Sequence, residues 1–233
     1  TGTGEPGLTI AATVNKGGSV TAIDLSEQML HIAETKAQAM SLNNFSVKVA
    51  DACNLPFEDN TFDAISCRLG FMFFPDMKLA AREMLRVLKP GGVLVTTVWA
   101  EPAKNNWITT IMGALKNYLE MPVPKPQAPG LFRCSTPSFL TALFAEQDVT
   151  NGIEKDIEGV MNCASASEYW NFMNDVVPPI VAALKTTDQH IINNIKQDVF
   201  EAFVGAIYLD HSYEMAEEFI IHVIEKYVDF TDI

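Results

Sequence analysis

Short apolar runs and helical repeats alternate over the first hundred residues. Four runs rich in Val, Ile and Phe predict buried strands, at residues 20–23, 45–49, 62–68 and 93–99. Between them, apolar residues recur at helical spacing and predict helices at 8–14, 27–40 and 76–88. Strands that alternate with helices are typical of a parallel sheet with helices on both faces.

Polar residues and glycines mark the ends of these elements. Ser26 and Asp76 belong to the residue types that cap helix N-termini, and each precedes a predicted helix. Asn43-Asn44 is expected to end the helix that Ser26 begins. Lys89-Pro90-Gly91-Gly92 is expected to stop the third helix as a turn before the next strand.

The pattern changes after residue 100. Residues 103–120 are predicted to be helical, and the prolines between 121 and 137 predict a stiff surface connection. A short helix is predicted at 137–147, capped by Thr136 or Ser135.

The last third combines one more predicted strand with several helices. Residues 153–161 are predicted to form a strand, and Ser165 and Glu168 fit a capping box that begins the next helix. Helix is expected to continue to about residue 207 with a break at Pro178-Pro179. Alternating residues predict a final strand at 218–225.

These elements suggest a single domain in three segments. Residues 1–100 would form the core that binds a cofactor, and 101–147 a helix and the proline-rich connection. Residues 148–233 would add the remaining strands with an inserted helical cap. A chain of 233 residues can bury a sizeable core in one such domain.

Composition and charge limit the kinds of partner that the chain is expected to bind. The formal net charge is −13, and no cluster of Lys and Arg is longer than a pair, so nucleic acid is not the expected partner. No apolar stretch approaches the roughly 18 residues of a membrane span, and integral membrane association is not expected. The cysteines and histidines lack metal-ligand spacing, so no metal site is predicted. The four cysteines are interpreted as reduced structural thiols, so a cytoplasmic compartment is expected.

The first seven residues carry the first candidate chemistry. Gly2-Thr3-Gly4-Glu5-Pro6-Gly7 is a G-x-G-x-x-G loop that opens a helix, where free N–H groups favour a negative ligand. Asp24 lies twenty residues after Gly4, at the end of the next predicted strand, where a carboxylate can accept both hydroxyls of a ribose. These two features fit NAD and S-adenosylmethionine equally well.

Further motifs separate the two cofactors. In order along the chain they are Val49-Ala50-Asp51-Ala52, Leu55-Pro56-Phe57, Phe62-Asp63, Arg68-Leu69-Gly70 and Arg86-Val87-Leu88-Lys89-Pro90-Gly91-Gly92. Over residues 1–99 the chain resembles the class I S-adenosylmethionine-dependent methyltransferases. Within that class it is most similar to the broad subgroup that contains the ubiquinone and menaquinone C-methyltransferases.

The resemblance implies an α/β fold, with a Rossmann-like, doubly wound, mostly parallel sheet of seven strands and a helical cap. In the family the glycine loop follows a central strand that ends in an acidic residue, whereas this sequence begins at Thr1. Omitting a central strand would leave unpaired backbone groups in the core. We therefore expect an upstream segment that supplies the first strand.

The resemblance also implies which residues hold the cofactor, S-adenosyl-L-methionine. Its methionyl part would lie against Gly2, Thr3 and Gly4, and its ribose against Asp24. Its adenine would pack against Leu25 and Met29, with the exocyclic amine on Asp51 and a ring nitrogen on the N–H of Ala52. Its carboxylate and amine would lie beside Arg68 and Leu69.

Several of these residues also have purely structural interpretations. Asp24 could cap a helix, Met29 could belong to a helix core, and Arg68 could pair with a carboxylate at the sheet end. No catalytic residue is assigned, and the general base and the oligomeric state stay open.

The expected reaction is in-line methyl transfer to a small molecule. Aromatic residues after the strands predicted at 62–68 and 93–99 suggest an apolar or aromatic acceptor, although they could instead pack the cap onto the sheet: Phe71, Phe73, Phe74, Trp99 and Trp107. Two alternatives are an NAD(P)-dependent oxidoreductase and a non-catalytic cofactor-binding protein. Whether oxygen, nitrogen or carbon is methylated stays open.

Overall fold

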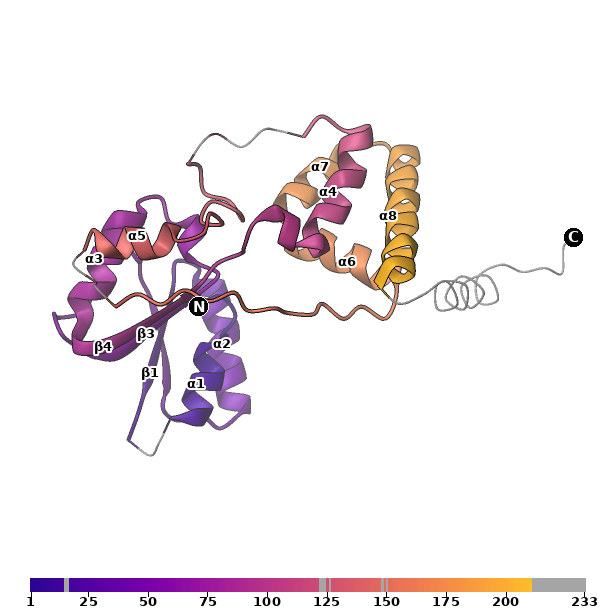
Figure 1. The fold of residues 1–233 in the computed structure, drawn as a ribbon. Coiled ribbons are helices and arrows are strands. Elements are labelled where there is room, and N and C mark those ends of the chain that lie inside the picture. The colour runs from indigo at the N-terminus through magenta and orange to yellow at the C-terminus, as the bar shows by residue number, and fades with distance from the viewer. Residues whose placement is uncertain (15–16, 122–124, 126, 148, 150, 211–233) are drawn as a thin grey trace, which may run out of the picture. The chain divides into compact units, whose positions relative to one another are not determined.

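The computed structural model describes residues 1–14, 17–121, 125, 127–147, 149 and 151–210. The chain divides into two compact units, residues 1–101 with 124–156 and residues 102–123 with 157–233. Unit 1 contains the strands and unit 2 is helical (Figure 1). The single domain with segment boundaries at 100 and 147 stays a prediction.

Unit 1 is an α/β unit whose elements match the predicted ones closely. In chain order they are α1 (Gly7–Thr13), β1 (Val20–Asp24), α2 (Glu27–Ala39), β2 (Phe45–Val49), β3 (Phe62–Arg68), η1 (Phe71–Phe73), α3 (Met77–Val87), β4 (Leu88–Thr97) and α5 (Phe139–Ala145). The predicted strands of the first hundred residues and the helices between them are therefore confirmed.

The strands pair in parallel in two separate sheets. β1 pairs with β2 from Val20 opposite Phe45 to Asp24 opposite Val49, so both strands end at the same edge. β3 pairs with β4 in the same sense, with Arg68 opposite Thr97. In the described part of the chain these two pairs are not joined by strand pairing, and the predicted seven-stranded sheet is not observed.

The Lys-Pro-Gly-Gly segment differs from its prediction. It is the start of β4 rather than a turn, because the pairing skips from Phe62 opposite Leu88 to Ala64 opposite Val93. The N–H groups of Asn60 and Thr61 donate to the carbonyls of Arg86 and Val87, at 3.0 and 2.8 Å. The chain thus enters strand pairing as soon as α3 ends, and the turn residues form an irregularity within the strand.

Two predicted caps are confirmed in unit 1. Ser26 Oγ accepts a hydrogen bond of 3.3 Å from the N–H of Met29 at the start of α2. Asp76 Oδ1 accepts one of 2.9 Å from the N–H of Leu79 at the start of α3. Each cap satisfies a backbone donor that the first turn of a helix leaves without a partner.

One apolar core joins both strand pairs. α3 contributes Ala80 and Ala81, and η1 contributes Phe71 and Met72, all four with 0% of their surface exposed. Ile23 of β1 and Ile65 of β3 pack against the same cluster. The two sheets are therefore held together by side chains.

The predicted cap of α5 is wrong. Its N-cap residue is Ser138, which has a φ of 62° and forms no side-chain cap hydrogen bond. The N–H of Ser138 instead donates to Glu154 Oε1 at 2.9 Å, sixteen residues later in the chain. The carboxylate of Glu154, distant in sequence, thus accepts the hydrogen bond from the start of α5, where Ser135 or Thr136 was expected to cap the helix.

The strand predicted at 153–161 is also wrong. The segment has no regular secondary structure, and Ile153, Ile157 and Val160 are 83–85% exposed. No described strand pairs with the segment, and pairing is what makes an extended segment a strand. The strand predicted at 218–225 lies outside the described residues.

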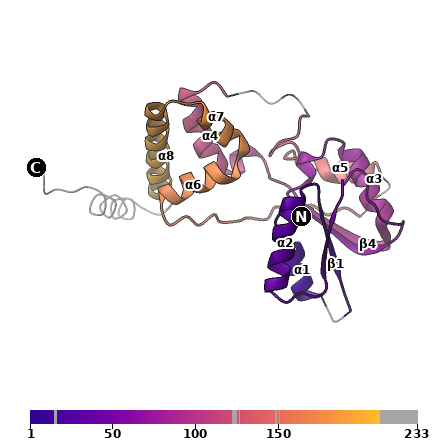
Figure 2. The ribbon, with the colours of Figure 1, turned by 180° about the vertical axis from the view of Figure 1, so that it is seen from behind.

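Unit 2 is built from η2 (Pro102–Lys104), α4 (Asn106–Tyr118), α6 (Ala166–Val176), α7 (Pro178–Lys185) and α8 (Gln189–Asp210), which Figure 2 shows from behind. The predicted break at Pro178-Pro179 is confirmed, because Pro178 is the first residue of α7. The predicted capping residue is confirmed too, since Ser165 Oγ accepts from the N–H of Glu168 at 3.1 Å.

The helices of unit 2 pack around their own apolar core. Its fully buried side chains include Ile108, Ile111 and Leu115 of α4, Met173 of α6, and Ile195 and Val199 of α8. Tyr169 Oη donates to the carbonyl of Trp107 at 2.6 Å, and burial raises the pKa of that tyrosine to about 12. No helix in the described part of the chain has the length and apolar character of a membrane span.

Candidate functional site

The glycine loop is attached to the end of β1 through Asp24. The N–H of Gly2 donates to Asp24 Oδ2 at 2.8 Å, and the N–H of Ser26 donates to Oδ1 at 2.9 Å. Burial by itself would raise the pKa of Asp24, but these donors and the ammonium group of Thr1, 3.2 Å from Oδ2, outweigh it and the pKa is lowered. The carboxylate is therefore ionised at neutral pH, and Oδ1, which accepts one hydrogen bond, keeps a lone pair for a hydroxyl donor.

Two positions of the loop require glycine. Gly4 has a φ of +123°, and a Cβ there would lie 2.5 Å from Leu8 Cδ1. A Cβ on Gly7 would lie 3.1 Å from Phe45 Cε2, which is tighter than ordinary van der Waals contact. The first requirement shapes the loop, and the second lets α1 pack closely on the β1–β2 sheet.

Lys36 is a loop contact that the sequence analysis missed. From α2, its Nζ donates to the carbonyl of Thr3 at 3.1 Å and to Thr3 Oγ1 at 3.3 Å. Lys36 follows Met29 by seven residues, two helical turns, and this spacing from a predicted site residue could have suggested it. The contact fixes the middle of the glycine loop and brings a positive charge to it.

The end of β2 brings Asp51 and Ala52 next to the end of β1. The N–H of Ala50 donates to the carbonyl of Asp24 at 3.1 Å, which ties the two strand ends together. Asp51 Oδ1 then accepts from the N–H of Cys53 at 2.8 Å, a turn that orients the carboxylate. Asp51 is exposed and Ala52 is buried, so this turn offers a carboxylate on a fixed backbone.

Leu25 and Met29 are apolar side chains that the fold leaves exposed. Leu25 follows Asp24 directly and is 68% exposed, and Met29 in the first turn of α2 is 45% exposed. The alternative that Met29 belongs to a helix core is therefore wrong. A flat ring joined to a ribose could pack on these exposed apolar side chains while its ribose hydroxyls bind the neighbouring carboxylate of Asp24.

Arg68 and Leu69 stand at the end of β3. Leu69 has a φ of 54°, uncommon for a residue other than glycine, and its N–H donates to the carbonyl of Thr97 at 2.9 Å. Arg68 is exposed and forms no ion pair with a described carboxylate. Among the described residues, no hydrogen bond joins this pair to the glycine loop, Asp24 or Asp51.

Part of the aromatic cluster after β3 is core rather than a binding surface. Phe71 is fully buried, and its ring centroid lies 5.2 Å from that of Phe74 and 5.4 Å from that of Phe144. Phe73 is 48% exposed. Of the cluster Phe71 to Phe74, Phe73 therefore has the most surface available to an acceptor, and Phe71 stabilises the fold.

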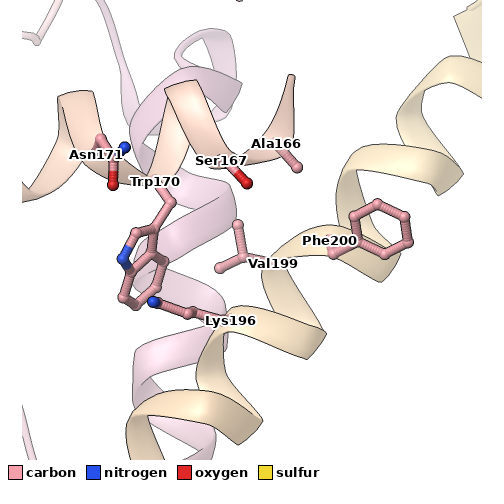
Figure 3. A pocket seen from close by; sticks show the side chains of 7 residues that line it. All are labelled: Ala166, Ser167, Trp170, Asn171, Lys196, Val199 and Phe200. Atoms are coloured by element: carbon pink, nitrogen blue, oxygen red, sulfur yellow. The ribbon is translucent and has the colours of Figure 1, made fainter. Parts of the chain in front are cut away.

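Two hollows lie away from the predicted cofactor residues. One of about 460 Å³ in unit 1 opens beside Arg133, between the start of α3 and α5. The other, of about 140 Å³ in unit 2, lies between α6 and α8, where Lys196 Nζ is 5.3 Å from the ring centroid of Trp170 (Figure 3). Neither hollow is lined by the glycine loop, Asp24 or Asp51.

Known proteins resemble the first part of the chain most clearly. Residues 1–96 match the family model described as "Methyltransferase domain". The demethylmenaquinone methyltransferase of Staphylococcus haemolyticus (strain JCSC1435) is 41% identical over 101 residues, which cover 43% of this chain and 41% of that protein. The protein of the same name from Staphylococcus aureus (strain MRSA252) gives the same figures, so the match spans about two fifths of these relatives.

A solved structure extends the likeness in fold. The YcgJ protein from Bacillus subtilis is 22% identical with a TM-score of 0.53, over 82% of this chain and 77% of that one. At this identity the likeness supports a shared α/β fold and nothing finer.

Proposed function

Since residues 1–96 match the family model described as "Methyltransferase domain", we propose that this chain transfers a methyl group from S-adenosylmethionine to a small acceptor. The motifs that indicated this class lie within the matched residues. The curated relatives are named methyltransferases, which supports methyl transfer over the oxidoreductase alternative.

One observation carries the proposal. Three of the segments predicted to hold the cofactor, the glycine loop and the ends of β1 and β2, are linked by hydrogen bonds in unit 1, from the N–H of Gly2 to the side chain of Asp24 and from the N–H of Ala50 to the carbonyl of Asp24. Asp51 follows Ala50 directly. A nucleoside or dinucleotide that binds at the ends of parallel strands needs a glycine loop, then a carboxylate for its ribose hydroxyls, and then a hydrogen-bond acceptor for its base, in this order.

The residues present fit such a ligand. We assign Asp24 to the ribose hydroxyls, because its ionised carboxylate retains acceptor capacity. We assign the exposed faces of Leu25 and Met29 to the adenine ring, and the edge of the ring to Asp51 and the N–H of Ala52.

The methionyl end is assigned to the loop and to β3. Gly2, Thr3 and Gly4 would lie along it, with Arg68 and Leu69 toward its carboxylate and amine. Arg68 is exposed and carries a charge that a carboxylate would complement.

When bound, S-adenosylmethionine supplies a methyl group already activated by a sulfonium. This chain's residues then have three tasks, to bind the donor, to align it for in-line attack and to keep water out. Asp24 and Asp51 would hold the nucleoside by its ribose and by its base. With both held, the sulfonium methyl group would keep one orientation relative to the glycine loop. No residue is assigned as a general base, because its need depends on the acidity of the acceptor.

For the acceptor we propose a small apolar or aromatic molecule. The net charge of −13 disfavours nucleic acid, and Phe73 is exposed at the carboxyl edge where α/β sites open. The relatives' name makes demethylmenaquinone the first acceptor to test.

The test is calorimetric titration with S-adenosylhomocysteine, followed by turnover with labelled S-adenosylmethionine. Asp24→Asn should weaken binding by roughly ten- to a hundredfold, because it removes an ionised acceptor for the ribose. Asp63→Asn, the same change at an exposed carboxylate paired with Lys89, should leave binding unchanged. Binding of NAD instead would overturn the proposal. Tight binding without turnover on quinone, phenol and amine acceptors would favour the non-catalytic alternative.

A further inference from the structure

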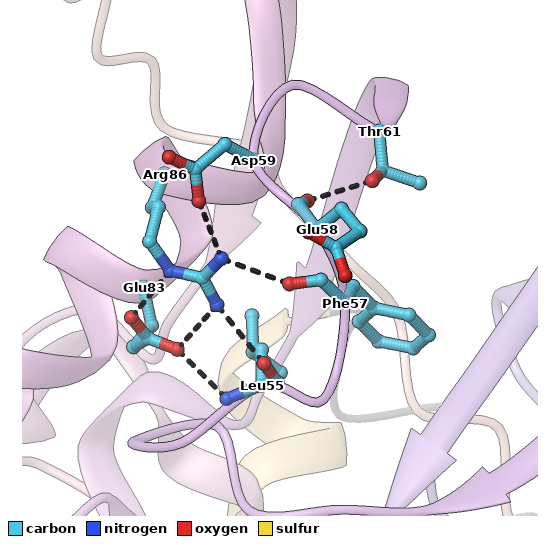
Figure 4. A network of polar contacts seen from close by, with 7 residues as sticks. All are labelled: Leu55, Phe57, Glu58, Asp59, Thr61, Glu83 and Arg86. Atoms are coloured by element: carbon cyan, nitrogen blue, oxygen red, sulfur yellow. Dashed lines mark hydrogen bonds and ion pairs between the residues drawn. The ribbon is translucent and has the colours of Figure 1, made fainter.

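Arg86, near the end of α3, has no N–H group left without an acceptor. Its Nε donates to Glu83 Oε1 at 2.8 Å, and its Nη2 donates to Glu83 Oε2 at 2.8 Å and to the carbonyl of Leu55 at 2.9 Å. Its Nη1 donates to the carbonyl of Phe57 and to Asp59 Oδ1, both at 2.8 Å. Figure 4 shows the guanidinium inside the loop that these residues form. The five N–H groups of the planar guanidinium thus bond five different oxygen atoms.

Glu83 completes the attachment of the loop. Its Oε2 also accepts from the N–H of Leu55 at 2.8 Å (Figure 4). The peptide groups of Leu55 are therefore held on both sides, the N–H by Glu83 and the carbonyl by Arg86. The side chain of Leu55 is buried in the core, so neither its backbone nor its side chain can shift independently.

This attachment lies next to Asp51 and Ala52. The N–H of Asn54 donates to the carbonyl of Asp51 at 3.0 Å and closes a turn, which Leu55 follows directly. Before the turn, Ala50 is bonded to Asp24 of β1. The turn is thus fixed at one end by the strand pair and at the other by the side chains of α3.

We propose that Arg86, together with Glu83, is a positioning residue that presents Asp51 and Ala52 to the adenine ring. The inference rests on the proposed function, because it concerns how that site distinguishes its base. An arginine is needed, because a lysine has three donors on one nitrogen and cannot reach two carbonyls and two carboxylates in one plane. A typical surface ion pair contributes little, but this guanidinium bonds loop backbone that the core also holds.

The experiment compares Arg86→Lys with Arg82→Lys, an exposed arginine on the same helix. Each protein is titrated with S-adenosylhomocysteine and with S-inosylhomocysteine, whose base lacks the exocyclic amine. The wild-type chain should prefer the adenine ligand, because Asp51 accepts from that amine. Arg86→Lys should weaken adenine binding by roughly tenfold and reduce the preference, whereas Arg82→Lys should retain both.

Each outcome decides the inference. Equal loss of both ligands in Arg86→Lys would indicate general destabilisation and overturn it, as would an unchanged preference. If Arg86→Lys does not fold, Asp59→Ala removes one of the five bonds at an exposed carboxylate, and the preference should fall by a smaller factor. A wild-type chain that binds neither ligand overturns the proposed function and this inference with it. If the wild-type chain binds S-adenosylhomocysteine and both Arg86→Lys and Arg82→Lys keep its preference for the adenine ligand, this inference alone is overturned.

Discussion

Asp24 and Glu83 are carboxylates whose ionised forms the folded chain stabilises. Burial opposes this at Asp24, but the N–H groups of Ser26 and Gly2 together with the ammonium group of Thr1 outweigh it and lower the pKa. The hydrogen bonds from Arg86 lower the pKa of Glu83. Unfolding returns both groups to ordinary values, about 3.9 for Asp and 4.3 for Glu. Between the folded and unfolded values, the unfolded chain binds more protons.

Stability should therefore be present above the unfolded pKa values and be lost as the pH falls through the folded ones. We expect the free energy of unfolding in urea to decline below about pH 4.5. Asp24→Asn should make that decline shallower, and Asp63→Asn, at an exposed ion pair, should change it less. An equally steep decline in the Asp24→Asn variant would contradict the role of this carboxylate.

Gly4 is the residue at which the loop tolerates least change. Gly4→Ala should lower the free energy of unfolding of unit 1 by about 2 to 4 kcal/mol, because the new Cβ meets Leu8 and the φ is unfavourable. Gly113→Ala is the matched control in α4, where a Cβ meets no atom within 4 Å. It should stabilise unit 2 by about 0.5 to 1 kcal/mol. Denaturant unfolding with probes in each unit measures both.

Helix starts show what local sequence can and cannot predict. Ser26, Asp76 and Ser165 were predicted as caps because the donor lies two or three residues away, within reach of one side chain. At α5 the backbone partner is Glu154, and only the folded chain brings it to Ser138. Caps are local chemistry, whereas this contact depends on tertiary structure.

This difference can be measured. Asp76→Ala should lower the free energy of unfolding by about 1 kcal/mol, because Leu79 loses its acceptor at the start of α3. Ser138→Ala should cost less than about 0.5 kcal/mol, because the Ser138 side chain forms no cap bond. A larger loss in Ser138→Ala than in Asp76→Ala would show that the two helix starts are stabilised in another way. Thermal or urea unfolding distinguishes these outcomes.

Strand prediction succeeded where a partner was present. The strands β1 to β4 combine apolar runs with a parallel neighbour, and each was predicted within a few residues apart from the Lys-Pro-Gly-Gly start of β4. Residues 153–161 were also predicted to be a strand, but they have no described partner and form none. A local pattern indicates that a segment can pair, but the pairing itself depends on the rest of the fold.

At the scale of the whole molecule, the sequence indicated the candidate site residues better than the side chains that hold their backbone in place. Gly2 and Asp24 were identified by spacing and Asp51 by the resemblance, and hydrogen bonds link Asp24 to Gly2 and to Ala50, which precedes Asp51. The contributions of Lys36 and Arg86 were missed, because each acts through a contact with backbone far away in sequence. Arg86 stood inside a quoted motif, yet a motif shows which residues recur and not which peptide groups they hold.

The exposed segment after α5 has a consequence for the integrity of the chain. Lys155 lies in it, between Ile153 and Ile157, and the boundary between the two units follows at residues 156 and 157. A protease binds its substrate in an extended form, so brief treatment with trypsin should cut here early. The cut would separate α4 from α6, α7 and α8 in sequence.

The two pieces should nevertheless stay together. α4 packs with α8 in unit 2, where Asn117 and Tyr118 both donate to Asp198 at 3.1 Å. After the cut we expect two bands on a denaturing gel and one peak in gel filtration. In the Asp198→Ala variant, the two fragments should dissociate at a lower urea concentration than the fragments of the wild-type chain. Unit 2 is in this sense a natural pair of complementing fragments, and the chain could be expressed as two polypeptides that reassemble.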